Sequence, residues 1–111
     1  MVTFDLHGVH KKPNAKAIYA EIRRRLEELD LQKSVYSSDR DADIDLPRNT
    51  FVGEFSVGTR FPSARVLRKY ISGKTRDVLK QVYPSATQFV LVGRGWSWGK
   101  RNVGKKKKSA L

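Results

Sequence analysis

The chain has 111 residues, of which 23 are Lys or Arg and 11 are Asp or Glu, so its formal net charge is +12. This length suits one domain and rules out a second, and 39% hydrophobic with 31% charged residues indicates a globular chain. The absence of cysteine excludes disulfide scaffolds, thiolate zinc sites and cysteine nucleophiles, and it agrees with a reducing compartment.

The first third of the chain predicts a strand, a helix and a second strand. Apolar and polar residues alternate from Val2 to Val9, which is typical of a half-buried strand. After Pro13, with Asn14 as the N-cap candidate, apolar residues recur at spacings of four, four and three, which predicts a helix from Ala15 to Leu31. A less regular strand pattern occupies Lys33 to Asp39.

The rest of the chain predicts a loop, two further strands and a helical region. Asp39 to Asn49 is polar and indicates a connection, whereas the alternation from Phe51 to Val57 predicts a strand. Helical spacing spans Ser63 to Tyr83, but Ser72-Gly73 interrupts it, so one weakened helix and two short helices both fit. Ala86 to Val92 is rich in β-branched and aromatic residues and predicts the last strand.

This order of elements predicts an α+β fold of the ferredoxin-like βαββαβ type. Its four-stranded antiparallel sheet carries both helices on one face, over residues 1–99, and a basic C-terminal tail follows at 100–111. The first and third strands are central in this layout, so we expect an open face made of Asp5, His7, Val52, Glu54, Ser56, Val90 and Val92. A sheet face that mixes apolar and acidic side chains is seldom bare, which predicts a face-to-face homodimer.

The charge predicts a polyanionic partner. Six positive charges lie in the tail with no acid among them, and the first 99 residues still carry +6. RNA or DNA is therefore the expected partner, although charge also serves solubility alone. No apolar run approaches the ~18 residues needed to cross a bilayer, and no secretory signal pattern opens the chain, so we expect a cytoplasmic protein with no membrane partner.

The segment Arg94-Gly95-Trp96-Ser97-Trp98-Gly99-Lys100-Arg101 carries the strongest local binding pattern. Two tryptophans two positions apart project to one side of an extended chain, where they can stack on bases while adjacent cations hold phosphates. Sealing of the core or of a dimer edge is the other interpretation of these rings. The expected nucleic-acid-binding residues are Arg23, Arg24, Arg94, Trp96, Trp98, Lys100, Arg101, Lys105, Lys106, Lys107 and Lys108.

The first strand carries the residues expected to do chemistry. The carboxylate of Asp5 can bind a divalent metal such as Mg²⁺ or act as a general base on a ribose 2′-hydroxyl or on water. His7 can exchange protons at neutral pH. A solvated strand carboxylate and a hydrogen-bonded turn histidine are the structural alternatives for this pair.

Four aspartates recur at every second position from Asp39 to Asp45. Their spacing raises the question of calcium binding, but the EF-hand pattern fails because Ile44 stands at the sixth position and Thr50 at the twelfth. We therefore expect a solvated loop.

The pattern Thr3-Phe4-Asp5-Leu6 at the end of a first strand resembles the endoribonucleases of the VapD and GhoS toxin–antitoxin families and the small dimeric nuclease of the CRISPR adaptation complex. The segment from Asp39 through Leu46-Pro47 into Thr50-Phe51 is also similar to GhoS-type proteins. The resemblance spans about residues 2 to 95 and implies that Asp5 is the first-strand carboxylate of a dimeric site. Separately, Asp5-Leu6-His7-Gly8 resembles the opening motif of Smr nuclease domains.

Together these patterns predict a dimeric protein that binds RNA, with weak metal-assisted phosphodiester cleavage at Asp5 as an added activity, in a toxin–antitoxin or phage-defence setting. The rival interpretation is a non-catalytic interaction protein, such as an antitoxin, a phage-encoded inhibitor or a nucleic-acid-binding adaptor.

Overall fold

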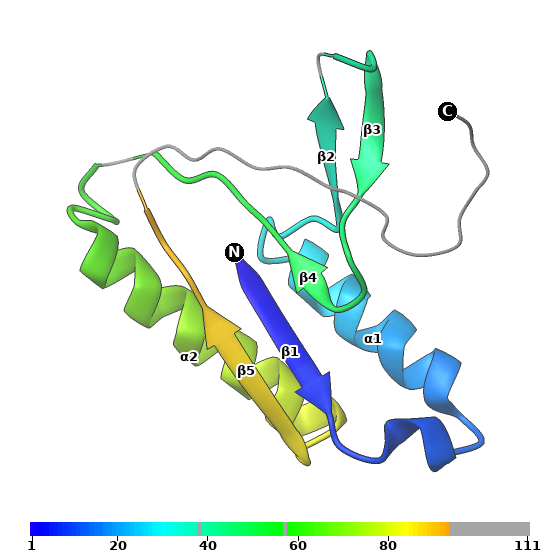
Figure 1. Ribbon diagram of the computed structural model, residues 1–111. Helices are drawn as coiled ribbons and strands as arrows, with labels where there is room; N and C mark the ends of the chain where they lie inside the picture. Colours follow the sequence, from blue (N-terminus) through cyan, green and yellow to red (C-terminus); the bar gives the residue numbers. More distant parts are fainter. Residues whose placement is uncertain (38, 57, 94–111) are drawn as a thin grey trace.

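The computed structural model describes residues 1–37, 39–56 and 58–93, which form an α+β structure with two α-helices (Figure 1). Both helices lie behind the main antiparallel sheet in the view of Figure 1. In chain order the elements are β1 (Val2–Leu6), the 3₁₀ helix η1 (Val9–Lys11), α1 (Ala15–Glu27), β2 (Ser34–Ser37), β3 (Ala42–Asp45), β4 (Thr50–Phe51), α2 (Ala64–Val82) and β5 (Ala86–Val90).

The first strand is the centre of the main sheet, as the order of elements predicts. β1 pairs antiparallel with β4 on one edge and with β5 on the other, so the strand order is β4-β1-β5. Its apolar side chains Val2, Phe4 and Leu6 are buried against the helices, while Thr3 and Asp5 point to the opposite, open face. The prediction that the first and third strands are adjacent in the sheet is thus confirmed.

The predicted four-stranded sheet is not confirmed, because the described residues form a three-stranded sheet and a separate two-stranded hairpin. Among the described residues, β2 and β3 pair only with each other, and Figure 1 shows them projecting from the main sheet. A single bridge between Gln32 and Val52, made by two backbone hydrogen bonds of 2.7 and 2.8 Å, connects this region to the end of β4. The loop expected between Asp39 and Asn49 therefore contains β3.

The strand expected from Phe51 to Val57 is much shorter than predicted. β4 contains only Thr50–Phe51, and no strand continues beyond the Val52 bridge. At Gly53 the backbone passes so close to the α1–β2 connection that an added Cβ would lie 2.6 Å from the Asp30 carbonyl oxygen. The segment after Val52 thus packs against that connection instead of continuing as a strand along β1.

Helix α1 ends earlier than the predicted Leu31, at a stop that its sequence encodes. Asp30 adopts a left-handed conformation with φ of 64°, and the amides of Asp30 and Leu31 donate to the carbonyls of Glu27 and Leu26. These two bonds form a Schellman motif, in which Leu26 and Leu31 are both buried. The apolar spacing continued through this turn because Leu31 packs into the core from outside the helix.

Helix α2 is one continuous helix, which decides between the two alternatives for its sequence. Ser63 caps its N-terminus by accepting a hydrogen bond of 3.3 Å from the Val66 amide. Gly73 is exposed in the middle of the helix and does not break it, because Ile71, Thr75 and Leu79 pack against the core on both sides of this position. In the part of the chain that the structure describes, no helix is long and apolar enough to cross a membrane.

Candidate functional site

The open face of the main sheet brings together Asp5, His7 and Thr87. In the register of β1 and β5, Asp5 lies directly opposite Thr87, so both side chains point to the same face. His7 follows β1, and its Nε2 lies 2.8 Å from the Thr87 Oγ1. Its Nδ1 lies 3.6 Å from the Asp5 Oδ2, which is beyond hydrogen-bond distance but within ion-pair range for a protonated imidazole.

The backbone at His7 is fixed from two sides. Its amide donates to the Ser85 carbonyl at 2.8 Å, and the Tyr83 hydroxyl donates to the His7 carbonyl at 2.6 Å. Gly8 follows with φ of 73°, a left-handed conformation that turns the chain away from the sheet into η1. Hydrogen bonds therefore hold the backbone that carries the imidazole, although half of the His7 side-chain surface is exposed.

This arrangement differs from the predicted surroundings of Asp5 and His7. We expected Glu54 and Ser56 beside them, but β4 pairs antiparallel with the opposite end of β1, at Val2 and Thr3. The chain after Val52 therefore runs away from Asp5. Thr87 on β5 is the neighbour that the sequence reasoning missed, and only the pairing register of β1 with β5 could have identified it.

The face carries different apolar residues from those predicted. Val90 lies opposite the buried Val2 and packs against the helix side of the sheet, and Val92 is partly buried as well. The open face instead presents Phe89, opposite Thr3, with 56% of its surface exposed, followed by Leu91 with 55% exposed. Phe89 and Leu91 alternate with Val90 and Val92, so apolar side chains lie on both faces of this segment. The alternation alone therefore did not decide which pair is buried.

The expected Mg²⁺ site at Asp5 has one carboxylate. The described residues contain no group of three or more His, Cys, Asp or Glu side chains placed to hold a metal ion, and this includes the aspartates of the β2–β3 hairpin. Mg²⁺ is often held by one or two carboxylates together with water and substrate phosphates. Asp5 fits such a site only if the phosphate and water supply the other ligands.

The arginines of α1 lie in ion pairs along their own helix. Arg23 pairs with Glu27 at 3.2 Å, and Arg24 pairs with both Glu21 at 2.7 Å and Glu28 at 3.1 Å. Hydrogen bonds from Arg24 and Arg25 lower the pKa of Glu21 to about 2. The Glu21 hydrogen bond in turn raises the pKa of Arg24. Two residues predicted to bind nucleic acid therefore already have carboxylate partners.

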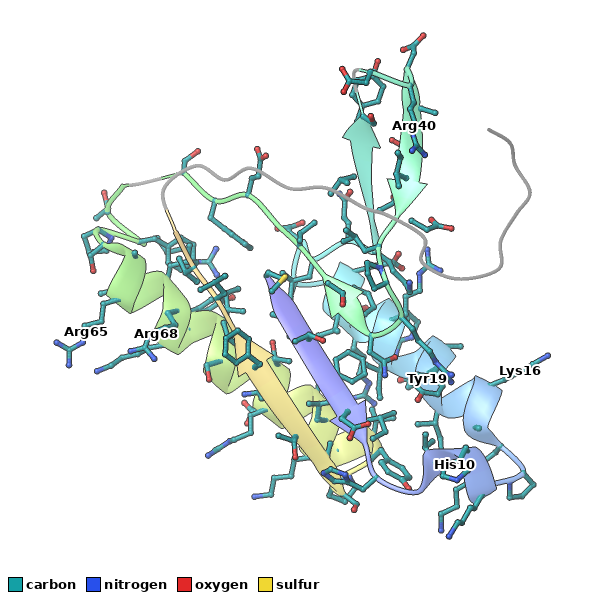
Figure 2. All side chains as sticks on the ribbon, in the orientation of Figure 1. His10, Lys16, Tyr19, Arg40, Arg65 and Arg68 are labelled. Atoms are coloured by element: carbon teal, nitrogen blue, oxygen red, sulfur yellow. The ribbon has the colours of Figure 1, made fainter. Side chains whose placement is uncertain are left out.

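Helix α2 carries the stronger basic surface. Six of its nineteen residues are Lys or Arg and one is acidic. All six are exposed, and none lies within 4.0 Å of a carboxylate among the described residues. Figure 2 shows Arg65 and Arg68 extending outward from this helix. We define the basic face of α2 as Arg65, Arg68, Lys69, Arg76 and Lys80, whereas Lys74 lies on the side toward Arg24 and Arg25 of α1.

The sequence contained a signal for this face. Arg65, Lys69, Arg76 and Lys80 are separated by four, seven and four residues, which places them along one side of a helix. The cations of the tail and the consecutive arginines of α1 are denser along the sequence, so charge density alone favours them over α2. The other predicted binding residues lie outside the described part of the chain: Arg94, Trp96, Trp98, Lys100, Arg101, Lys105, Lys106, Lys107 and Lys108.

Comparison with protein-family models, curated proteins and solved structures finds no match for this chain.

Proposed function

We propose that the protein binds RNA through the basic face of α2. The observation that carries this proposal is the unequal pairing of the two helices. The three consecutive arginines of α1 pair with glutamates three and four residues away, whereas the cations of α2 have no carboxylate partner among the described residues. Segment 94–111 contains no Asp or Glu that could pair with them.

The dimensions of this face suit a nucleic-acid strand. From Arg65 to Lys80 the helix rises about 22 Å at 1.5 Å per residue. At 3.4 Å per nucleotide in one strand of a duplex, this length covers roughly six phosphates. Guanidinium and ammonium groups that lack a carboxylate partner can release counterions from phosphates without first breaking an internal ion pair.

Two features support the finer parts of the proposal. The strand order and the Gln32–Val52 bridge support a ferredoxin-like layout in which the second strand of the main sheet is reduced to one bridge. The exposed Phe89 and Leu91 support a homodimer through the end of the open face beside Met1 and Thr3, away from Asp5. A toxin–antitoxin or phage-defence setting follows from the family resemblance. Mg²⁺-assisted cleavage at Asp5 stays a prediction.

Binding to labelled RNA and DNA, measured by fluorescence anisotropy over a range of salt concentrations, tests the proposal. The variant Lys69→Gln/Arg76→Gln should weaken binding and reduce the slope of log affinity against log salt by about 0.7 per lost contact on a single strand. The matched control is Arg23→Gln/Arg24→Gln, which removes the same charge from α1 and should leave the slope nearly unchanged.

Three outcomes would contradict the proposal in different ways. Equal losses in both variants would mean that net charge, and not the basic face of α2, determines binding. A wild-type slope in the α2 variant would place the RNA contact elsewhere. A wild-type chain that binds neither nucleic acid would favour the alternative of a non-catalytic protein-interaction module.

A further inference from the structure

The group on the open face has the connectivity of a proton relay. His7 has a hydroxyl at one ring nitrogen, 2.8 Å from Nε2, and a carboxylate at the other, 3.6 Å from Nδ1. In the tautomer that carries its proton on Nδ1, on the side of the carboxylate, Nε2 accepts a hydrogen bond from the Thr87 hydroxyl. An imidazole nitrogen that accepts from a hydroxyl is placed to remove that hydroxyl's proton.

Independent contacts hold the three residues in place. The β1–β5 ladder sets Asp5 opposite Thr87, and the Tyr83 hydroxyl and Ser85 carbonyl fix the backbone of His7. The side chains nevertheless remain open to solvent, with 77% of the Asp5 side chain and 51% of the His7 side chain exposed. A polymer lying across the sheet can therefore reach the Thr87 oxygen without rearrangement of the fold.

We infer that Thr87, His7 and Asp5 form a metal-independent relay that cleaves RNA by internal transfer of the phosphodiester. This inference rests on the proposed function, because a strand held on α2, behind the sheet, must continue around the β5 edge to reach the open face. The ribose 2′-hydroxyl is the attacking group, so the substrate class is RNA and DNA is excluded.

The reaction balances without a co-reactant. Thr87 passes its proton to the His7 Nε2 and takes the proton of the 2′-hydroxyl. The 2′-oxygen forms a bond to phosphorus while the bond from phosphorus to the 5′-oxygen breaks. The leaving 5′-oxygen, on the opposite side of phosphorus, takes a proton from water, and the hydroxide so formed removes the proton from the His7 imidazolium. The products are a 2′,3′-cyclic phosphate and a 5′-hydroxyl, and the relay returns to its starting state.

The three residues should contribute unequally. General acid–base catalysis contributes about 10²- to 10⁴-fold, and an open site without enclosed anion stabilisation belongs near the lower limit. Asp5 does not contact the substrate, and its charge is screened by solvent at 3.6 Å, so its removal should cost only about threefold.

The test uses the full chain and a labelled DNA strand that contains one ribonucleotide, with EDTA present and product ends identified by mass spectrometry. Wild type should yield the 2′,3′-cyclic phosphate, and an all-DNA strand should stay intact. His7→Gln and Thr87→Val should each slow cleavage about 100-fold, and Thr87→Ser, which keeps the hydroxyl, should be at least tenfold faster than Thr87→Val. Asp5→Asn should be about threefold slower than wild type.

Two controls separate this relay from contamination and from loss of binding. His10→Gln changes the other histidine, which lies on η1, and should cleave at the wild-type rate. Fluorescence anisotropy with the uncleavable all-DNA strand, and separately with 2′-O-methyl RNA, should show that every variant keeps the wild-type affinity for that strand.

The outcomes distinguish this inference from the proposed function. Binding without cleavage in EDTA overturns the relay and leaves the RNA-binding proposal intact. Cleavage that needs Mg²⁺, is lost in Asp5→Ala and is unchanged in His7→Gln overturns the relay in favour of metal-assisted chemistry. Failure to bind RNA overturns both.

Discussion

Two glycines of this chain, Gly53 and Gly73, differ in the space that an added Cβ would find. An added Cβ at Gly53 would lie 2.6 Å from the Asp30 carbonyl oxygen and 3.0 Å from the Phe55 ring. The backbone oxygen cannot rotate away as a side chain can. At Gly73, in the exposed middle of α2, an added Cβ would meet nothing within 4 Å.

We therefore expect opposite effects of alanine at these two positions. Gly53→Ala should lower the free energy of unfolding by about 1–3 kcal/mol, the usual cost of overpacking. Gly73→Ala should raise it by about 0.5–1 kcal/mol, because alanine is the better helix former. Urea denaturation measures both changes, and a destabilising Gly73→Ala would show that α2 needs flexibility there.

Glu21 gives a pH-dependent prediction at the same scale. Its pKa falls from the usual 4.5 to about 2 in the folded chain, because Arg24 and Arg25 bind its carboxylate. A group with a depressed folded pKa contributes stability above its unfolded pKa and loses that contribution as pH falls through the folded value.

Wild type should therefore be more stable than Glu21→Gln at pH 6, and the difference should shrink between about pH 4.5 and pH 2. Thermal unfolding across this range checks the prediction. Added salt should reduce the difference at pH 6, since the carboxylate is exposed. A difference that stays constant down to pH 2 would show that the arginines do not hold Glu21.

At the scale of elements, the sequence predicted those elements whose apolar spacing has one dominant face. The alternation of β1 and the spacing of α2 correspond to buried residues in the structure. It did not predict β3, since Asp43 and Asp45 flank Ile44 in a strand that is nearly all exposed and resembles a polar loop. Long-range pairing also decided the orientation of Val90 and the contact between His7 and Thr87, and a single sequence does not encode this pairing in any local pattern.

The β2–β3 hairpin should exchange its amide hydrogens much faster than β1. Of the described residues in the buried core, none belongs to this hairpin. Its attachment to the rest of the chain includes the Gln32–Val52 bridge, next to the base of the hairpin. Hydrogen exchange should show local opening of the hairpin at far lower free energy than global unfolding.

The comparison segment for this measurement is β1, whose amides should exchange only on global unfolding. Equal protection in β1 and in the hairpin would mean that the hairpin packs against something that the described residues do not include.

At the scale of the whole molecule, the exposed apolar side chains Phe89 and Leu91 predict that two copies of the chain associate. Sedimentation at tens of micromolar should give a dimer of about 25 kDa, twice the 12.7 kDa chain. Phe89→Asp should shift the protein toward the monomer, because the exposed ring lies on the open face opposite Thr3. Val66→Asp, at an exposed apolar position on α2, is the matched control and should remain dimeric. A wild-type monomer would contradict the prediction.

The position of β1 has a consequence for how the chain folds as it is synthesised. The central strand is made first, but its outer partner comes last: the Met1 amino group and the Leu91 carbonyl meet across 90 positions of sequence. At roughly 5–20 residues per second, β1 waits on the order of ten seconds before β5 exists. During that interval the edge of β1 that pairs with β5 lacks its native partner, whereas β4, on the other edge, is made after about half of it. We expect the nascent chain to depend on chaperones, and a circular permutant that joins β5 directly to β1 to fold faster, since it replaces the most distant pairing with a local hairpin.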